Sequence, residues 1–429
     1  MTKKNHHRPR RTSPLLSGET QHRRHRPDYS LIIICLLLLV IGMVIVYAIS
    51  PGLAAQSELS ESHFVRRQML AIVLAIVTFF VVARLPLEIW WRSIKVLIAI
   101  TVIALLATQF TGSGEANAAR WVQVGGLSFQ SVELLKFTLV IWLAGFLSQR
   151  HREGTINDFQ RTLKPLAIVL ATSGFIVAVL QSDLGSMGVV AGIIAVMLFV
   201  AGVSWRLLFI GAAAILFAGS LLIFTSPYRQ ERVATFLNPQ ADCLAEGYQA
   251  CQALIAIGSG GLFGKGIDRS AQAYGYLPEA ANDSIFAVYA EMFGFVGVVV
   301  VIALLVALFT RLHRIIERTP SMYSQLIVVG VLTWLSIQAF INIMAMVGLF
   351  PLKGITLPFI SYGGTSIIFV TAAVALVFNI SRYSTFSVIQ AKQPNKAARQ
   401  SNKKGILRDN PVKRRRNGRP HYAYPIRRT

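Results

Sequence analysis

Long apolar runs recur along most of this chain and are separated by short polar or charged segments. A helix of about 20 apolar residues crosses a hydrocarbon core about 30 Å thick. Ten runs approach or exceed that length, and they lie at residues 30–50, 68–84, 93–110, 131–149, 163–181, 184–202, 205–226, 284–310, 322–348 and 366–384. The pattern predicts an all-α polytopic membrane protein with ten transmembrane helices.

The composition agrees with that class, because 54% of the 429 residues are hydrophobic and only 14% are charged. The net charge of +23 is concentrated at the two ends. Residues 1–29 hold eight Lys and Arg and two acids, and residues 385–429 hold thirteen and one. These tails therefore carry +18 of the +23, and they are predicted to be disordered. We expect them to attract anionic lipid, with a cytoplasmic partner as the alternative, and we expect no nucleic-acid binding.

The charge of the loops predicts the orientation of the spans. With ten spans both tails lie on one side, and the positive-inside rule makes that side the cytoplasm. We count 11 Lys and Arg in the 41 residues of the predicted inner loops, at 84–95, 150–164, 203–206 and 311–320. We count 6 in the 109 residues of the predicted outer loops, at 51–65, 111–130, 227–283 and 349–365. The large loop between spans seven and eight is therefore predicted to be extracytoplasmic.

Two of the three cysteines, Cys243 and Cys251, lie in that large outer loop. If the loop faces an oxidising space, a disulfide between them is expected, and two free thiols or a metal site are the alternatives. Cys35 lies within the first span and is expected to be a small packing residue. The cysteines thus supply one candidate crosslink on the outer side.

Asp283 stands directly before the span at 284–310, and Glu279 lies four residues upstream of it. A carboxylate at the mouth of a membrane helix is costly to desolvate, which favours a functional role. Glu133 and Lys136 begin the fourth span three residues apart, so they share one helix face. They are expected either to pair with one another or to contact a substrate.

Further polar residues lie at the predicted outer face. Asp183 precedes the sixth span, as a helix cap or a substrate contact. Arg120 and Trp121 are either a lipid-interface anchor or a contact for phosphate and sugar. Lys265 lies in a glycine-rich segment that is either a flexible turn or a cradle for an anion. Lys353 adds a positive charge to the last outer loop.

The ionisable groups therefore gather on one side of the membrane. They are Arg120, Glu133, Lys136, Asp183, Arg232, Lys265, Glu279, Asp283 and Lys353. The predicted midplane is nearly free of charge, whereas proton-driven transporters place acids there. This distribution indicates binding or chemistry at the outer leaflet on an anionic, lipid-attached substrate.

Four blocks of sequence resemble the SEDS family (shape, elongation, division and sporulation proteins: FtsW, RodA and SpoVE). They are NAARWVQVGGLSFQSVELLK (117–136), QSDLGS (181–186), GYQACQALIAIGSGGLFGKG with YLPEAANDSIFAVYAE (247–291), and LPFISYGGTS (357–366). The resemblance covers roughly residues 28–384 and is strongest to the cell-division member. It implies a ten-helix membrane domain at 30–384 between basic tails at 1–29 and 385–429.

The resemblance implies a peptidoglycan glycosyltransferase that polymerises lipid II at the outer face of the cytoplasmic (inner) membrane. It also implies a class B penicillin-binding protein and other divisome membrane proteins as partners, with location at the division septum. The family's essential aspartate matches Asp283. Where the family usually has Thr and Phe around this aspartate, the chain has Asn282 and Ser284. Arg232 and Ser361 join the substrate-binding candidates.

Joining an α-linked donor sugar to a 4-hydroxyl in a β-1,4 bond is a single inversion, so one general base is enough, and Asp283 suits that role. Basic residues or a divalent cation, Mg or Mn, are expected to stabilise the leaving pyrophosphate, and no organic cofactor is expected. A lipid II flippase and a non-catalytic divisome scaffold remain the alternatives.

Overall fold

The computed structural model describes residues 27–113, 121–124, 127–238, 243–245 and 247–382. The tails at 1–26 and 383–429 and the predicted contact Arg120 lie outside the described residues. The helices in chain order are α1 (Tyr29–Gln56), α2 (His63–Arg84), α3 (Leu87–Arg92), α4 (Ile94–Thr111), α5 (Ser131–Arg152), α6 (Lys164–Gly174), α7 (Leu184–Ala201), α8 (Trp205–Phe224), α9 (Pro227–Leu237), α10 (Tyr248–Gly260), α11 (Ile285–Arg318), α12 (Met322–Met346) and α13 (Gly364–Ser381). Short π-helical turns at Phe159–Leu163 and Phe175–Leu180 extend α6 at both ends.

The predicted helical membrane fold is confirmed. Within the described ranges, nine helices are long and apolar enough to cross a membrane, counting α6 with its π-helical extensions as one. The span predicted at 93–110 corresponds to α4, whose apolar part, Ile94–Thr108, is shorter than the other nine. The hydrophobic runs therefore locate the helices well, because the length of an apolar run is a local property.

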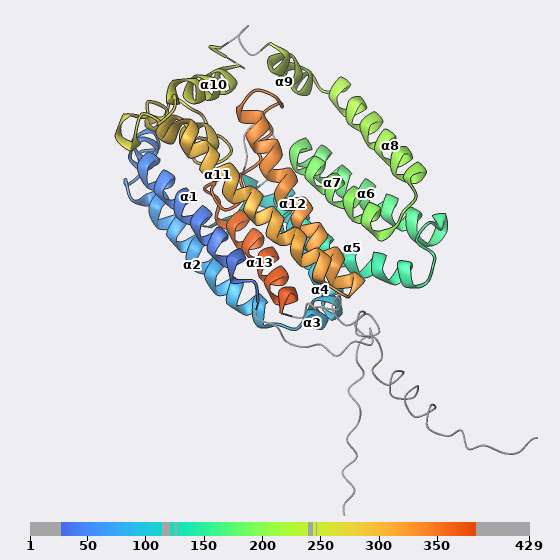
Figure 1. Ribbon diagram of the computed structural model, residues 1–429. Coiled ribbons are helices and arrows are strands. Elements are labelled where there is room, and N and C mark those ends of the chain that lie inside the picture. The colour runs from blue at the N-terminus through green and yellow to red at the C-terminus, as the bar shows by residue number, and fades with distance from the viewer. Residues whose placement is uncertain (1–26, 114–120, 125–126, 239–242, 246, 383–429) are drawn as a thin grey trace, which may run out of the picture. The chain divides into compact units, whose positions relative to one another are not determined.

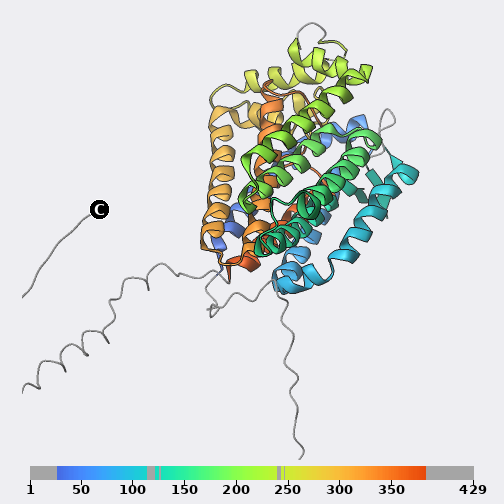
Figure 2. The same ribbon diagram turned by 90° about the vertical axis from the view of Figure 1, so that its right-hand side faces the viewer.

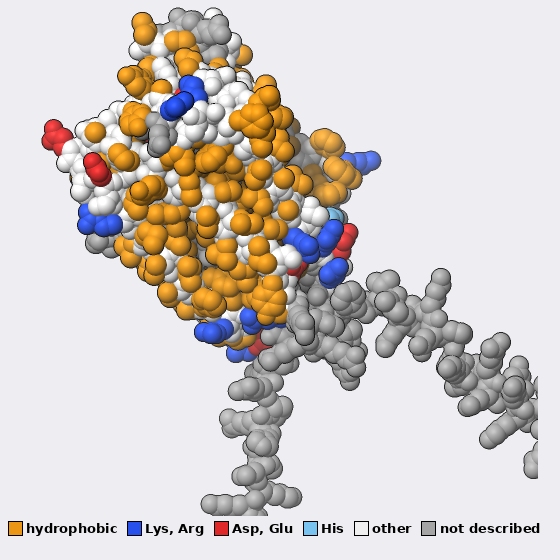
Figure 3. Space-filling view, turned by 60° about the vertical axis from the view of Figure 1, so that its left-hand side comes forward, with side chains coloured by type: hydrophobic (Ala, Val, Ile, Leu, Met, Phe, Trp, Pro, Cys, Tyr) orange, Lys and Arg blue, Asp and Glu red, His pale blue; other side chains and the backbone are white. Residues whose placement is uncertain are grey.

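Helices α5, α12 and α13 are largely buried and form the centre of the helical domain. Around them α2 packs against α13, α4 and α7 pack against α5, and α7 and α11 pack against α12. Helix α1 packs against α2 and α11. Helix α8 has no buried residue and lies at the edge, where it is drawn apart from α12 and α13 (Figure 1). Apolar side chains cover a broad face of the domain, with charged side chains at its two ends (Figure 3). This is the surface expected of a protein solvated by lipid.

A small antiparallel sheet follows α4, and the sequence pattern did not predict it. Its strands are β1 (Gly112–Ser113), β2 (Trp121–Val124) and β3 (Leu127–Gln130), in the order β1-β2-β3. Trp121 pairs with Gln130 in register. The backbone N–H of Gln130 donates to Thr365 Oγ1 at 3.1 Å, which ties the start of α5 to the start of α13. The strands are too short for their alternation to stand out in the sequence.

Helix α11 is interrupted at Gly294, whose φ is 63°. The glycine-rich segment after α10 supplies the hydrogen bonds that the break removes. Phe295 N donates to Gly261 O at 2.9 Å, and Lys265 N donates to Glu291 O at 2.9 Å. The backbone of this segment therefore pairs with α11 on both sides of the break, which occupies the N–H groups of Lys265 and Gly266.

Two glycines of this segment are required by close packing. A Cβ on Gly264, where φ is +81°, would lie 2.1 Å from Met292 O, and a Cβ on Gly260 would lie 2.2 Å from Ala290 O. Neither contact leaves room for a larger side chain. The glycine-rich pattern thus reflects the approach of two backbones at Gly260 and Gly264.

Candidate active site

Asp283 lies immediately before α11 in a buried turn. Its side chain is 7% exposed, and Asp283 Oδ1 has no hydrogen-bond partner among the described residues. The pKa of this carboxyl is raised from 3.8 to about 7, mainly by burial and also by the negative charge of Glu279, whereas Arg232 opposes the shift. A carboxylate with a pKa near 7 can accept a proton at neutral pH.

Glu279 shapes the turn that holds Asp283. It adopts a positive φ of 53°, and its backbone oxygen accepts hydrogen bonds from Asn282 N at 2.9 Å and Ser284 N at 3.1 Å. Its carboxylate also accepts from the side-chain amide of Asn282. Ser284 Oγ accepts from Nε2 of Gln249 on α10 at 3.0 Å. Asn282 and Ser284, where the chain departs from the family pattern, therefore each have a structural partner.

The turn is also fastened to α12 and to the last outer loop. Tyr362 N donates to Ala281 O at 2.8 Å. Asn342 on α12 donates from Nδ2 to Asp283 O and to Ile355 O, both at 2.7 Å. Asn342 was not among the residues predicted from the sequence. A lone amide within an apolar span is costly in lipid unless it has partners, and that cost could have indicated Asn342 as a functional or structural residue.

A group of charged residues lines one pocket, and one of its members, Arg232, acts electrostatically on Asp283. It comprises Arg229 and Arg232 from α9, Lys353 from the last outer loop and Asp183 before α7. Partial burial lowers the pKa of Lys353, and the nearby arginine charges lower it further, while Asp183 opposes them. Positive charge therefore exceeds negative charge in this pocket, which suits a phosphate group.

The structure explains how distant segments meet at this pocket. Asp183 caps α7, because its Oδ1 accepts from Ser186 N at 2.9 Å. Arg232 Nη1 donates to Leu352 O at 3.3 Å. A Cβ on Gly185 would lie 2.8 Å from Lys353 Cβ, so the last outer loop packs directly on the start of α7. Asp183, Arg232 and Lys353 are thereby brought together, as expected for a shared site.

Glu133 and Lys136 form an ion pair that is almost fully buried. Lys136 Nζ lies 2.6 Å from Glu133 Oε1 and 2.8 Å from Gln338 Oε1. It also lies 5.2 Å from the ring centre of Trp334. Gln338 Nε2 donates to Thr356 O at 3.0 Å, so the pair anchors the last outer loop. Of the two interpretations from sequence, the structure supports pairing and gives neither residue a surface for substrate.

Lys265 and Ser361, which were predicted to contact substrate, each have a partner within the protein. Lys265 Nζ pairs with Glu291 Oε1 at 2.8 Å. Glu291 follows Asp283 by eight residues, or about 12 Å along a helix. Ser361 is buried, and its Oγ accepts from Leu357 N at 2.7 Å, which closes the turn of the last outer loop. These two residues therefore shape the loops around the site.

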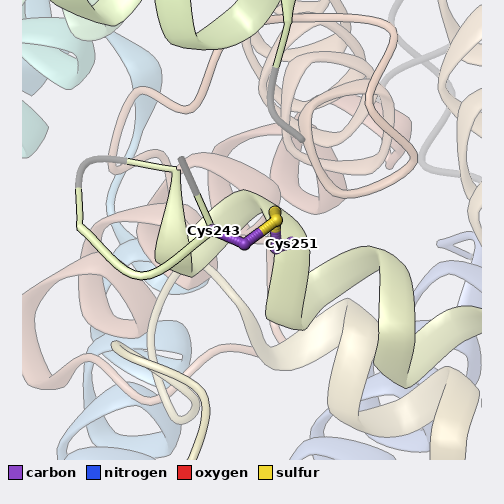
Figure 4. The surroundings of a disulfide bond; sticks show 2 residues. All are labelled: Cys243 and Cys251. Atoms are coloured by element: carbon purple, nitrogen blue, oxygen red, sulfur yellow. A yellow bond between two sulfur atoms is a disulfide. The ribbon is translucent and has the colours of Figure 1, made fainter. Parts of the chain in front are cut away.

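The long outer loop contains a disulfide between Cys243 and Cys251, with a Cα–Cα distance of 5.7 Å (Figure 4). It joins the segment before α10 to the first turn of that helix, from which Gln249 reaches Ser284. Helices α9 and α10 lie together across one end of the domain (Figures 1 and 2). The backbone of Trp121 lies in β2, and its side chain is outside the described atoms.

This geometry defines a class of protein: a polytopic helical membrane protein with a buried carboxylate and a basic pocket. Residues 29–386 match the model of a cell cycle protein family, that of FtsW, RodA and SpoVE. The chain belongs to this family.

Two relatives and two solved structures show how far the similarity extends. The chain is 36% identical to stage V sporulation protein E of Bacillus subtilis over 364 residues, covering 84% of this chain and 98% of that protein. It is 35% identical to the probable peptidoglycan glycosyltransferase FtsW of Coxiella burnetii over 358 residues, covering 82% and 95%. A chain solved in a peptidoglycan synthase complex matches with a TM-score of 0.66 at 26% identity, covering 83% and 98%. RodA of Thermus thermophilus matches with a TM-score of 0.59 at 27% identity, covering 84% and 98%.

Proposed function

We propose that this chain is a peptidoglycan glycosyltransferase that polymerises lipid II at the outer face of the cytoplasmic membrane. The observation that carries the proposal is the buried Asp283, whose pKa of about 7 suits a general base, together with a basic pocket whose Arg232 acts electrostatically on it. Several relatives are named as probable peptidoglycan glycosyltransferases, which supports the same activity.

The reaction joins the 4-hydroxyl of one lipid II to the anomeric carbon of a lipid-linked sugar. Asp283 accepts the hydroxyl proton as the new C–O bond forms. The bond between the anomeric carbon and the pyrophosphate oxygen breaks, and undecaprenyl pyrophosphate leaves with the electron pair. The anomeric centre inverts once, so the reaction needs no covalent carboxylate intermediate.

The leaving pyrophosphate is bound by the basic pocket. Arg232 and Lys353 carry positive charges that stabilise the charge developing on the leaving group. Arg229 lies in the same pocket, where it also donates to Leu222 O at 2.9 Å and to Ala178 O at 2.8 Å. Arg232 thus acts electrostatically on Asp283 and also lines the pocket, so it links the proposed base to the proposed anion site.

A divalent cation, Mg or Mn, would enter this pocket only together with the pyrophosphate, because the pocket itself carries more positive than negative charge. The described ranges hold no group of three or more His, Cys, Asp or Glu that would ligate a metal by itself. Mg²⁺ is commonly held by one or two carboxylates together with substrate phosphates, and Asp183 supplies such a carboxylate there. The cation would add positive charge beside the pyrophosphate.

The proposed partner is a class B penicillin-binding protein, and the proposed setting is septal wall synthesis with other divisome membrane proteins. Support comes from the solved complex, which is described as coordinating polymerization and crosslinking. The FtsW names of several relatives favour the division role and the inner membrane at the septum. The basic tails are proposed to bind anionic lipid there.

The activity is tested by incubating the purified chain with lipid II, with and without a class B penicillin-binding protein, and measuring glycan polymer. We expect Asp283→Asn to abolish polymer formation while the protein stays folded. Glu61→Gln removes another acid, which is exposed, and should leave the rate unchanged. Normal polymerisation by Asp283→Asn would refute the proposal. Flipping of labelled lipid II in proteoliposomes without polymer formation would favour a flippase instead.

A further inference from the structure

The side chain of Asn342 lies between the two backbone segments that carry the candidate site residues. It is 2% exposed and comes from α12, roughly one turn from the end of that helix. Its Nδ2 donates to the carbonyl of Asp283 and to the carbonyl of Ile355, each at 2.7 Å. Both partners are acceptors, so the amide nitrogen must face them, and the orientation of the amide is determined.

Neither carbonyl lies inside regular secondary structure. The first turn of α11 directs Ala287 N to Ser284 O at 3.0 Å, leaving the oxygen of Asp283 outside the helical pattern. Ile355 lies in the irregular last outer loop, two residues after Lys353. A buried backbone carbonyl requires a donor. One amide of Asn342 satisfies both carbonyls and thereby joins the base-bearing turn to the cation-bearing loop.

We propose that Asn342 is a positioning residue that sets the spacing and orientation of the Asp283 carboxylate relative to the Lys353 loop. The inference rests on the proposed glycosyltransferase activity. Asn342 touches neither substrate nor the reacting atoms in this arrangement, and acts through the backbone of the two segments. Misplacing a catalytic group by about 1 Å costs on the order of 100-fold in rate.

Asn342 should also affect the pKa of Asp283, because that pKa depends on how deeply the carboxyl is buried. The same hydrogen bond holds the turn in its buried position, and burial is the largest cause of the raised pKa of this carboxyl. Without the bond the turn relaxes toward water, and the pKa of Asp283 moves down toward its ordinary value. Glu279 and Arg232 are the other charged groups that act on Asp283, and neither depends on Asn342 for its charge.

The test uses the full-length chain in proteoliposomes with lipid II. Asn342→Leu removes the donor at similar volume. The matched control is Asn379→Leu, because Asn379 is also buried and its Nδ2 donates to a backbone carbonyl, that of Leu85, at 2.6 Å. Polymer formation is measured as a function of substrate concentration and of pH, together with the melting temperature of each variant.

For Asn342→Leu we expect kcat to fall about 10- to 100-fold with KM within about threefold of the parent. We also expect the acid limb of the kcat profile to move to lower pH. Asn379→Leu should lower the melting temperature but change neither kcat nor the pH of the acid limb. If Asn342→Leu fails to fold, Asn342→Ser is compared with Asn379→Ser under the same expectations, since the shorter hydroxyl cannot reach the carbonyls that the amide contacts.

Equal loss of kcat in the Asn342 and Asn379 variants, or an unmoved acid limb, would overturn the positioning role. The parent chain and Asp283→Asn are measured in parallel. An inactive parent, or an active Asp283→Asn, contradicts the glycosyltransferase proposal itself. An active parent with indistinguishable Asn342 and Asn379 variants contradicts only the role of Asn342.

Discussion

Replacing Asp283 by Asn should abolish activity and yet stabilise the fold at neutral and alkaline pH. The pKa of Asp283 rises from 3.8 to about 7 on folding, because burial disfavours its charged form. An acid whose pKa is raised in the folded state binds a proton more tightly there, so folding is favoured at low pH. This stabilisation begins to fall as pH rises past 3.8, and is lost by about pH 7.

The size of the effect follows from the shift. One pKa unit corresponds to about 1.36 kcal/mol, so a shift of about three units costs the folded protein about 4 kcal/mol when Asp283 is ionised. The neutral amide of Asp283→Asn avoids this cost. The variant should therefore unfold at a higher temperature than the parent at pH 8, and the difference should disappear near pH 4.

The assay is thermal unfolding of the purified parent and Asp283→Asn from pH 4 to pH 9, with Glu61→Gln as the exposed control. In parallel, kcat/KM of the parent for lipid II should rise with pH and reach half its maximum near the pKa of about 7. Equal melting temperatures at pH 8, or a rate that stays constant down to pH 5, would refute the reasoning. Either result would mean that the Asp283 carboxyl is exposed to water and has the ordinary pKa of an aspartate.

The remaining predictions concern the surrounding framework. Lys136→Met leaves its buried glutamate unpaired, so the free energy of unfolding should fall by about 3–5 kcal/mol; an unchanged melting temperature would contradict the anchoring role. Gly264→Ala should destabilise by more than about 2 kcal/mol through its positive φ and its collision with α11, whereas Gly258→Ala, with nothing within 4 Å, should change stability by less than about 1 kcal/mol. Reducing the Cys243–Cys251 disulfide should lower the free energy of unfolding by about 2–3 kcal/mol and so lower the melting temperature. Mass spectrometry that finds two free thiols in the native protein would exclude the bond.

Hydrophobic run length was sufficient to predict the membrane helices. Asp283 was found for the same reason, since a carboxylate next to an apolar run stands out without any tertiary information. The short strands around Trp121 were missed because four residues carry too little periodicity. The break in α11 at Gly294 was missed because its hydrogen bonds are supplied by a segment about 30 residues earlier.

What a side chain pairs with was much harder to infer. Lys136, Lys265 and Lys353 all appear in sequence as cations near the outer face. The structure buries the first against Glu133, pairs the second with Glu291, and leaves the third in a pocket where positive charge dominates.

The sequence alone determines which residues enter the membrane and identifies Asp283 as an acid that is costly to desolvate, because both properties depend on neighbours along the chain. Only the tertiary structure decides which charges are already neutralised and which remain for a ligand. It alone places Asn342 between Asp283 and the last outer loop. The physical reason is that a charge or an amide is satisfied by whatever lies within about 3 Å in space, and those partners here are up to 294 residues away in sequence.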